Sequence, residues 1–421
     1  MDVFQIIALL ITLAALFSYL NYRVIRLPTT IGLMLISLVF SMALIASGYT
    51  GLGLKAWAAE LMVQIDFNQT LMHGMLSFLL FAGALHVDLS SLLQRKWTIG
   101  ILATLGVVTS TFLIAGAMYF VLGWIGLPLS FLYCLIFGAL ISPTDPIAVM
   151  GLLKQAKAPK SLETKISGES LFNDGVGVVV FLVIKEILES GEGFDVSHAG
   201  MLLLEEGIGG IALGLLLGWI TFRMLRSIDN YQVEILLTLA LVTGGYALAN
   251  AIHTSGPLAI VAAGLLIGNR GRALAMSDRT REHLDTFWEL IDEVLNAVLF
   301  VLIGMEILVL SLNPGYLLAG LIAIPVVLTA RFISVGVPVS LLRLRIDFSP
   351  HVIKILTWGG LRGGISVALA LSLAASTERT FILTVTYVVV VFSIVVQGLT
   401  MPALLRKAVP GRVASDAGEE P

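Results

Sequence analysis

The chain has 421 residues, of which 57% are hydrophobic and only 13% charged, with a formal net charge of −3. A mean hydropathy of +0.97 excludes the polar surface that a soluble protein of this size needs, and the near-neutral charge gives no indication of nucleic-acid binding. The single cysteine excludes a disulfide framework and a thiolate metal site. The composition therefore predicts a polytopic integral membrane protein.

Apolar segments of about 17–25 residues, long enough to cross a bilayer, follow one another along the chain. The first has no basic region and no small-residue cleavage site, so we interpret it as a retained helix rather than a signal peptide. Residues 1–407 are predicted to form one transmembrane domain, and residues 408–421 a short cytoplasmic tail. The pattern predicts thirteen spans, with twelve as the alternative count, at residues 3–20, 29–47, 70–87, 98–122, 131–153, 163–187, 200–222, 231–251, 256–269, 287–311, 315–341, 352–375 and 381–405.

Lysine and arginine alternate between the loops as the positive-inside rule requires. Loops after odd-numbered spans, with the span ends that adjoin them, carry 20 basic residues, and those after even-numbered spans carry 3. This bias supports thirteen spans and predicts a multi-pass protein of the cell (inner) membrane with its N-terminus outside and its C-terminus in the cytoplasm. The two remaining basic residues, Arg331 and Arg362, fall inside spans eleven and twelve.

Span five is interrupted in its middle by two prolines. Pro143 and Pro146 each lack an N–H and clash with the carbonyl four residues earlier, which frees the carbonyls of Ala139 and Ser142. Asp145 before Pro146 has the pattern of an N-cap followed by a proline at the first helical position. We therefore expect a broken helix of the kind that holds ions near the midplane of secondary transporters. A proline kink with a capping aspartate is the alternative.

Span six carries four polar residues that one turn of helix brings together. Ser170 and Asp174 share one face, and Glu169 and Asn173 share the adjacent one. At about 1.5 Å per residue from Glu163, Asp174 lies roughly 16 Å deep, near the midplane. A carboxylate at that depth costs several kcal/mol (about 2.5–3.5 on insertion scales), so it indicates a functional site.

The two intramembrane arginines need compensation. Arg331 reaches a depth similar to that of Asp174, and a buried arginine needs a carboxylate partner, for which Glu169 and Asp145 are the candidates. Arg362 stands among four glycines at residues 357–364, and glycine lowers helix propensity by about 1 kcal/mol, so span twelve is also expected to unwind. Small-residue packing between helices is the alternative, but it leaves Arg362 unexplained.

A repeat is suggested by the positions of the two interrupted spans. Spans five and twelve differ by seven, an odd number, so spans 1–6 and 8–13 would be repeats of inverted topology. Sequence similarity between the halves is faint, and the expectation rests on geometry.

The intramembrane charges suggest a mechanism. Asp145, Glu169 and Asp174 contribute −3 when ionised, and Arg331 and Arg362 contribute +2. If all five face one cavity, one negative charge is uncompensated, and either one monovalent cation or one proton neutralises it. Mutually exclusive occupancy is the minimum requirement for an antiporter. Oxygen ligands suit a hard cation, which would be transported, and we expect no cofactor.

Two other functions are compatible with intramembrane acids. A cation channel would also use them, but it would not need arginines that leave a single net charge. An intramembrane aspartyl protease would need two catalytic aspartates, for which Asp145 and Asp174 are candidates. However, Pro146 makes Asp145 a cap, and no Gly-x-Gly-Asp motif is present at either residue. We therefore expect a transporter rather than an enzyme.

Several of these motifs resemble those of a known family. The break at residues 144–146, the Glu-Ser-x-x-Asn-Asp run at 169–174, the Gly-Leu-Arg-Gly-Gly run at 360–364 and the short span at 256–269 are similar to those of the NhaP-type sodium/proton antiporters, relatives of the animal sodium/proton exchangers. The resemblance covers residues 1–405. It implies an all-α fold of thirteen helices in two inverted six-helix repeats with helices five and twelve broken, a homodimer, and elevator-like alternating access.

The resemblance also implies roles for individual residues. Asp174 and Ser170 would bind Na⁺, with Li⁺ or K⁺ as the alternative ions, and the unwound backbone at Thr144 would help. Asp174 would be shared with the proton. Glu169 would pair with Arg331, and Asn173 in place of an aspartate is typical of the electroneutral branch. Asp145 and Asn173 complete the expected ion and proton site, and Arg362 the charge compensation. One departure is span three, where residues 80–83 lack the carboxylate of some relatives. The implied function is exchange of Na⁺ for H⁺ in pH homeostasis.

Overall fold

The computed structural model describes residues 3–48, 56, 58–60, 62, 65, 67–146, 149–151, 153, 160–190, 196–310, 313–344, 348 and 351–408. Within these ranges the chain consists of helices, with one isolated antiparallel bridge between Asp145 and Leu361 and no strand. The all-α prediction is confirmed. The predicted tail lies outside the described residues, apart from Ala408 at the end of the last helix.

Each predicted span overlaps a helix or consecutive helices of the described chain. The first six spans correspond to α1 (Val3–Leu20), α2 (Thr29–Ser47), α4 (Phe67–Gln69) with η3 (Thr70–Met75) and α5 (Leu76–Leu85), α7 (Lys96–Ala103) with α8 (Leu105–Trp124), α9 (Phe131–Ile141), and α11 (Lys160–Ser190). Two short helices, η1 (Asn21–Ile25) and α6 (Leu89–Gln94), lie between them.

The second half continues in the same way. Its spans correspond to α12 (Val196–Leu225), α13 (Tyr231–Ala251), α14 (Gly256–Leu266) with η4 (Ile267–Gly271) and α15 (Arg272–Ala275), α16 (Asp278–Met305) with η5 (Glu306–Leu308), α17 (Pro314–Leu342), α18 (Val352–Trp358) with α19 (Gly364–Leu371), and α20 (Thr377–Phe392) with η6 (Ser393–Gln397) and α21 (Gly398–Ala408). By length and composition, 8 segments of the described chain are able to cross a membrane. The protein is therefore a multi-pass membrane protein, and the number of thirteen crossings stays a prediction.

Polar caps determine where several helices begin. The side chains of Asn230, Ser255, Ser277, Asn313 and Ser376 each accept a hydrogen bond from a backbone N–H in the first turn of the helix that follows. Such caps satisfy donors that have no partner within the helix. In α14 and α17 a proline also occupies the first turn, where its missing N–H costs nothing.

Small residues allow α12 and α14 to pack at short distance. A Cβ atom added at Gly218 would lie 3.1 Å from the Cα atom of Ala263, and the glycines one and two turns earlier are closer still to the backbone of α14. Close backbone approach through small residues is the usual way in which membrane helices associate. The rows that meet are Gly210, Gly214 and Gly218 on α12 and Ser255, Ala259 and Ala263 on α14.

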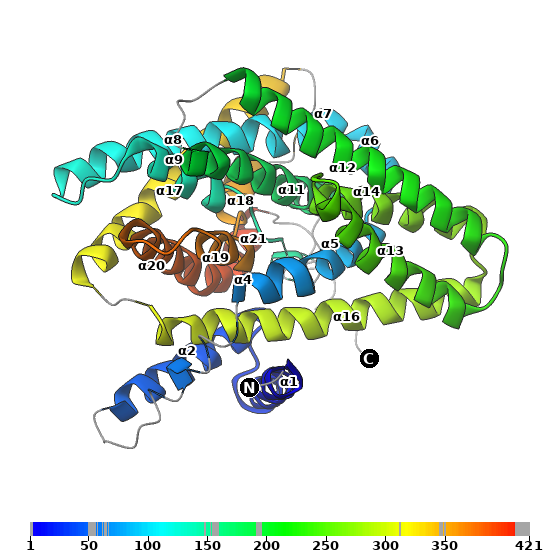
Figure 1. The fold of residues 1–421 in the computed structure, drawn as a ribbon, viewed down its shortest axis with the longest axis horizontal. Coiled ribbons are helices and arrows are strands. Elements are labelled where there is room, and N and C mark those ends of the chain that lie inside the picture. Colours follow the sequence, from blue (N-terminus) through cyan, green and yellow to red (C-terminus); the bar gives the residue numbers. More distant parts are fainter. Residues whose placement is uncertain are drawn as a thin grey trace.

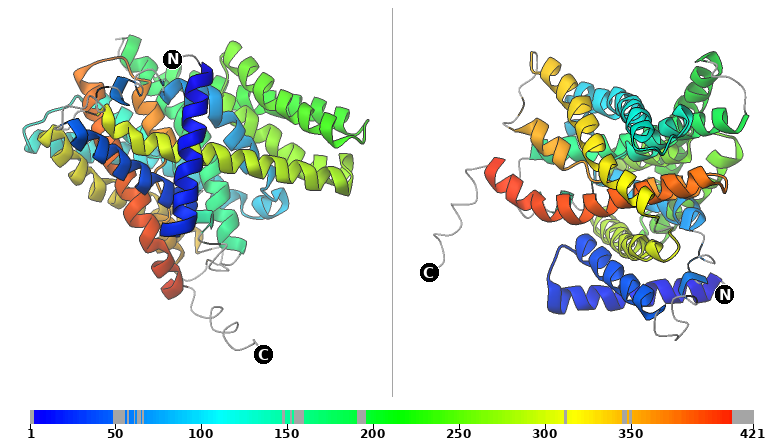
Figure 2. Two further views of the ribbon diagram at one scale, coloured as in Figure 1. Left: turned by 90° about the horizontal axis from the view of Figure 1, so that it is seen from below. Right: turned by 90° about the vertical axis from the view of Figure 1, so that its left-hand side faces the viewer.

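The long helix α16 runs along one side of the molecule (Figure 1). Helices α1 and α2 lie outside it, side by side at the edge of the molecule (Figure 2). The hydroxyl of Ser37 on α2 donates a hydrogen bond of 2.7 Å to the carbonyl of Val301 on α16. Large apolar side chains of α1, including Phe4 and Tyr19, are exposed, as expected for a helix that faces lipid.

The interrupted helices lie in the interior. All residues of α9 from Cys134 to Ile141 are buried, and so are most residues of α19. Irregular backbone at membrane depth is tolerated only where protein or a water-filled cavity surrounds it. The fold therefore shields from lipid the two segments that the prolines and glycines interrupt.

Candidate ion-binding site

The break of span five is present and contacts the break of span twelve. Helix α9 ends before Pro143, which has no N–H to continue it. The backbone N–H of Asp145 donates 2.8 Å to the carbonyl of Leu361, and the N–H of Met150 donates 2.7 Å to the carbonyl of Pro146, the spacing of a helical turn. The prediction of a broken helix at this position is confirmed.

Span twelve is unwound between α18 and α19, as its glycines predicted. A Cβ atom at Gly360 would lie 2.7 Å from Nε of Arg331 and 3.2 Å from Cγ2 of Thr144, and a Cβ at Gly363 would collide with the carboxylate of Asp145. These glycines are therefore needed because the two unwound segments cross in contact. The alternative of plain helix packing does not account for them.

Arg362 supplies the donor that the first break lacks. Its Nη1 donates to the carbonyls of Ser142 and Pro143, the latter at 2.8 Å. Its own backbone N–H donates 2.9 Å to the hydroxyl of Ser393. The carbonyl of Ser142 is one of the two that proline was expected to free. A fully buried guanidinium thus lies against two carbonyl dipoles, of which that of Ser142 has lost its helical partner because Pro146 has no N–H.

A polar triangle joins the first break to α11. The N–H of Thr144 donates 3.2 Å to Oδ1 of Asn173, and Nδ2 of Asn173 donates 2.8 Å to Oγ1 of Thr144. The hydroxyls of Thr144 and Ser170 are 3.1 Å apart. All three residues are buried. The structure therefore brings together three of the residues that the sequence singled out as ion ligands.

Glu169 is the carboxylate that the structure places against Arg331. Nη1 of Arg331 lies 2.6 Å from Oε1 of Glu169, and the side chains are only 6% and 2% exposed. Nη2 of Arg331 also donates 3.3 Å to the carbonyl of Leu356. Of the two partners that the sequence left open, Glu169 rather than Asp145 makes this pair.

A cavity of about 1020 Å³ reaches the crossing and is lined by both Asp145 and Asp174. Asp174 is buried, with 8% of its surface exposed, and the carboxylate of Asp145 is near enough to act on it electrostatically. Two other residues near basic loops line the same cavity. Arg26 belongs to the loop after span one, and His86 lies at the end of span three, just before the next basic loop. The cavity therefore extends from the side of the basic loops to the carboxylate of Asp174.

The assumption that all five intramembrane charges face one cavity is wrong. Among the described residues that line the large cavity are Asp145 and Asp174, but neither Glu169, Arg331 nor Arg362. The two arginines line a small separate void instead. Residue spacing gives the depth of a side chain but not the direction in which its helix is turned, which is why the sequence could not separate the two groups.

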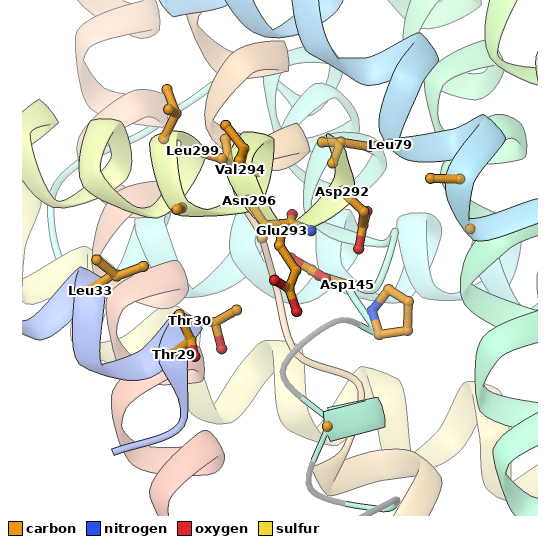
Figure 3. Close-up of a pocket in the computed structure, with 18 of the residues that line it drawn as sticks. Thr29, Thr30, Leu33, Leu79, Asp145, Asp292, Glu293, Val294, Asn296 and Leu299 are labelled. Atoms are coloured by element: carbon orange, nitrogen blue, oxygen red, sulfur yellow. The ribbon is translucent and has the colours of Figure 1, made fainter. Parts of the chain in front are cut away.

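Helix α16 contributes polar residues to the cavity that the sequence analysis missed. Asp292, Glu293 and Asn296 line it, and Figure 3 shows them beside Asp145. The sequence did contain a signal for them. Asp292 and Glu293 fall inside the predicted span 287–311, and acidic residues within a membrane span indicate a functional site.

Two interrupted helices that cross inside a helical membrane protein, with a buried carboxylate that lines a cavity, define a secondary ion transporter. The sodium/hydrogen exchanger family model, for the transmembrane part, matches residues 10–407. The chain belongs to this family. It is a transporter rather than an enzyme, which excludes the protease alternative.

Known relatives are similar over nearly their whole length. The chain is 52% identical over 415 residues to the Na⁺/H⁺ antiporter NhaP of Pseudomonas aeruginosa, with 97% of each chain covered. It is 33% identical to the Na⁺/H⁺ antiporter NhaH of Halobacillus aidingensis, with 96% and 98% covered. The structure of the sodium proton antiporter MjNhaP1 from Methanocaldococcus jannaschii matches with a TM-score of 0.75 and 20% identity over 98% of this chain and 100% of that one. This last similarity establishes the fold.

The buried pair generates a prediction about stability. Replacing Glu169 or Arg331 singly with alanine leaves one buried charge without its partner, at a cost of about 3–5 kcal/mol. We expect each single variant to unfold at a clearly lower temperature in detergent and the double variant to regain much of the loss.

The exposed pair of Asp278 and Arg281, 3.1 Å apart on one helix, is the matched control. Its double-mutant cycle is expected to show almost no coupling, because exposed pairs contribute little. If the losses at Glu169 and Arg331 simply add in the double variant, the two residues are not energetically paired.

Proposed function

We propose that this protein exchanges Na⁺ for H⁺ across the cell (inner) membrane by alternating access. Family membership and the similarity to a curated Na⁺/H⁺ antiporter at 52% identity support the substrates. The observation that carries the proposal is the position of Asp174, which is buried, lines the cavity and lies one helical turn from Ser170, whose hydroxyl meets that of Thr144 in the break.

The proposed cation ligands are oxygen atoms. The carboxylate of Asp174, the hydroxyl of Ser170 and the oxygens of Thr144 are the hard donors that an alkali cation prefers. Asp145 faces the same cavity and adds negative potential. Na⁺ is here a substrate that binds and leaves.

Competition for Asp174 follows from its burial. A carboxylate withdrawn from water is costly as a bare anion, so the protein favours a state in which either Na⁺ or H⁺ neutralises it. Both cannot bind the same ionised oxygens at once. Arrival of Na⁺ from one side therefore expels the proton, and arrival of the proton expels Na⁺.

The charge balance supports one-for-one exchange. Glu169 and Arg331 cancel as a pair. Asp145 and Asp174 carry −2 when ionised, and Arg362, whose backbone adjoins the Asp145–Leu361 bridge, carries +1. At the crossing itself one negative charge remains, which one Na⁺ or one proton neutralises. The carboxylates that α16 adds to the cavity keep their charge throughout this scheme, so a cycle moves no net charge.

Asn173 is proposed to position the site rather than to titrate. Both atoms of its amide group are used, one accepting from the N–H of Thr144 and the other donating to its hydroxyl. An aspartate at this place would lose the donor and would put an anion beside the hydroxyl oxygen. The amide therefore keeps the break of span five attached to α11.

The proposal extends to the assembly and its orientation. The basic loops support a cytoplasmic C-terminus and an outside N-terminus, so the cavity opens toward the cytoplasm. The exposed apolar faces of the outer helices supply area for a homodimer, against which an elevator-like movement of the crossed helices would occur. The physiological role proposed is pH homeostasis.

The first functional prediction concerns Asp174. Asp174→Asn removes the charge for which Na⁺ and H⁺ compete but keeps the shape of the side chain. We expect loss of Na⁺-dependent H⁺ movement in proteoliposomes, followed with a pH-sensitive dye, while the folded yield is maintained. Glu163→Gln, at the start of the same helix, is the control and should keep exchange. Exchange retained by Asp174→Asn would remove Asp174 from the site.

The second functional prediction concerns voltage. A K⁺/valinomycin potential is worth about 2.3 kcal/mol per charge per 100 mV, so a cycle that carries net charge responds strongly. We expect the steady-state Na⁺ gradient in wild-type proteoliposomes to be insensitive to that potential. Asn173→Asp is expected to be inactive in the same assay, because the carboxylate cannot make the hydrogen bond that Nδ2 of Asn173 donates to the hydroxyl of Thr144. A wild-type gradient that follows the voltage contradicts one-for-one exchange.

A further inference from the structure

Helix α16 brings a second group of oxygen atoms to the cavity, apart from the proposed ligands on α11. Asp292 and Asn296 are four residues apart and so lie on one face of this helix. Both line the cavity together with Glu293 (Figure 3). In the figure their side chains lie beside the segment that carries Asp145. None of these α16 residues has a part in the exchange mechanism derived above.

Asn296 has a buried side-chain oxygen atom that no described residue contacts through a hydrogen bond. The residue is only 4% exposed, and its side chain hydrogen-bonds to that of Asp292. An ionised carboxylate only accepts, so the amide nitrogen of Asn296 is the donor. Its Oδ1 atom has no hydrogen-bond partner among the described residues. A buried acceptor without a partner costs about 1–3 kcal/mol, which a donor or a cation in the cavity would relieve.

The surroundings of this oxygen are negative. The carboxylates of Asp145, Glu289 and Glu293 all act electrostatically on Asp292. Among the described residues that line the cavity, the basic ones are Arg26 and His86. Negative charge in a recess with low-dielectric walls concentrates cations there.

We propose that the Asp292 carboxylate and Oδ1 of Asn296 form an entry site for one partly hydrated alkali cation, Na⁺ in the proposed function on which this inference rests. In the described chain no three acidic, histidine or cysteine side chains converge closely enough to hold a metal ion. A divalent ion takes more protein oxygens, as Ca²⁺ does with six to eight ligands. One carboxylate and one amide oxygen, completed by water, suit a monovalent ion that must leave again.

The place of this site in the transport path follows from the cavity. It lies on the α16 wall, and Asp174 on α11 lines the same space. A cation that enters from the side of the basic loops can exchange part of its hydration shell for Asp292 and Asn296 before it reaches Asp174. The site therefore speeds the loading of the transport site during turnover at low Na⁺ concentration.

The test measures initial rates of exchange against the Na⁺ concentration offered to the cytoplasmic face, in everted membrane vesicles. Asp292→Asn and Asn296→Ala are each expected to raise KM for Na⁺ by about three- to tenfold while Vmax changes by less than twofold. Glu282→Gln removes a negative charge from an exposed position on the same helix and is the control, with KM unchanged. Asn296→Ser, which keeps an oxygen, should lie between wild type and Asn296→Ala.

A second condition separates coordination from attraction alone. At high choline chloride the Debye length falls to about 3–5 Å, so a general effect of negative charge is screened. The KM difference of the uncharged substitution Asn296→Ala should persist there.

Three results would overturn the site. One is a wild-type KM in Asn296→Ala, which leaves only general attraction by the acids. Another is an equal loss of Vmax at constant KM in both variants, which indicates a structural role. The third is absence of Na⁺/H⁺ exchange in wild type, which overturns the proposed function as well and so is distinguishable from the first two.

Discussion

Two unwound segments can cross inside this membrane protein only because their backbone groups find partners in the protein. Arg362 donates to the carbonyls of Ser142 and Pro143, and the N–H of Asp145 donates to the carbonyl of Leu361. Without water or lipid partners at this depth, each unsatisfied group would cost several kcal/mol. The glycines, the buried arginines and the position of the acidic residues all follow from the requirement that the backbone groups at this crossing have partners inside the protein.

The crossing also separates charges that do different things. The Glu169–Arg331 pair is nearly dry and faces away from the large cavity, so it holds helices together without offering a site to ions. Asp145 and Asp174 face the cavity, where a cation can reach them. Glu169 and Arg331 neutralise each other and stabilise the protein. Asp145 and Asp174 give the cavity an excess of negative charge, so the buried carboxylate of Asp174 remains available for exchange.

The sequence predicted features that depend on local chemistry. Pro143 and Pro146 required a break, the glycines around Arg362 predicted another, and apolar length located the long helices. Features that depend on the direction of a side chain were not predictable. Depth alone left both Glu169 and Asp145 as partners for Arg331. It suggested one cavity for all five charges, whereas Arg331 and Arg362 line a small void apart from the large cavity. It could not show that Asp292 and Asn296 line the large cavity.

The central claim is that Na⁺ and H⁺ compete for one buried carboxylate at the crossing. The most direct measurement is calorimetric titration of the purified protein with Na⁺ in buffers of different ionisation enthalpy, which counts the protons released on binding. In the acidic range the account predicts about one proton released per Na⁺ bound. It also predicts that the apparent affinity for Na⁺ falls about tenfold for each unit by which the pH is lowered. Binding of Na⁺ without proton release, at an affinity independent of pH, would contradict it.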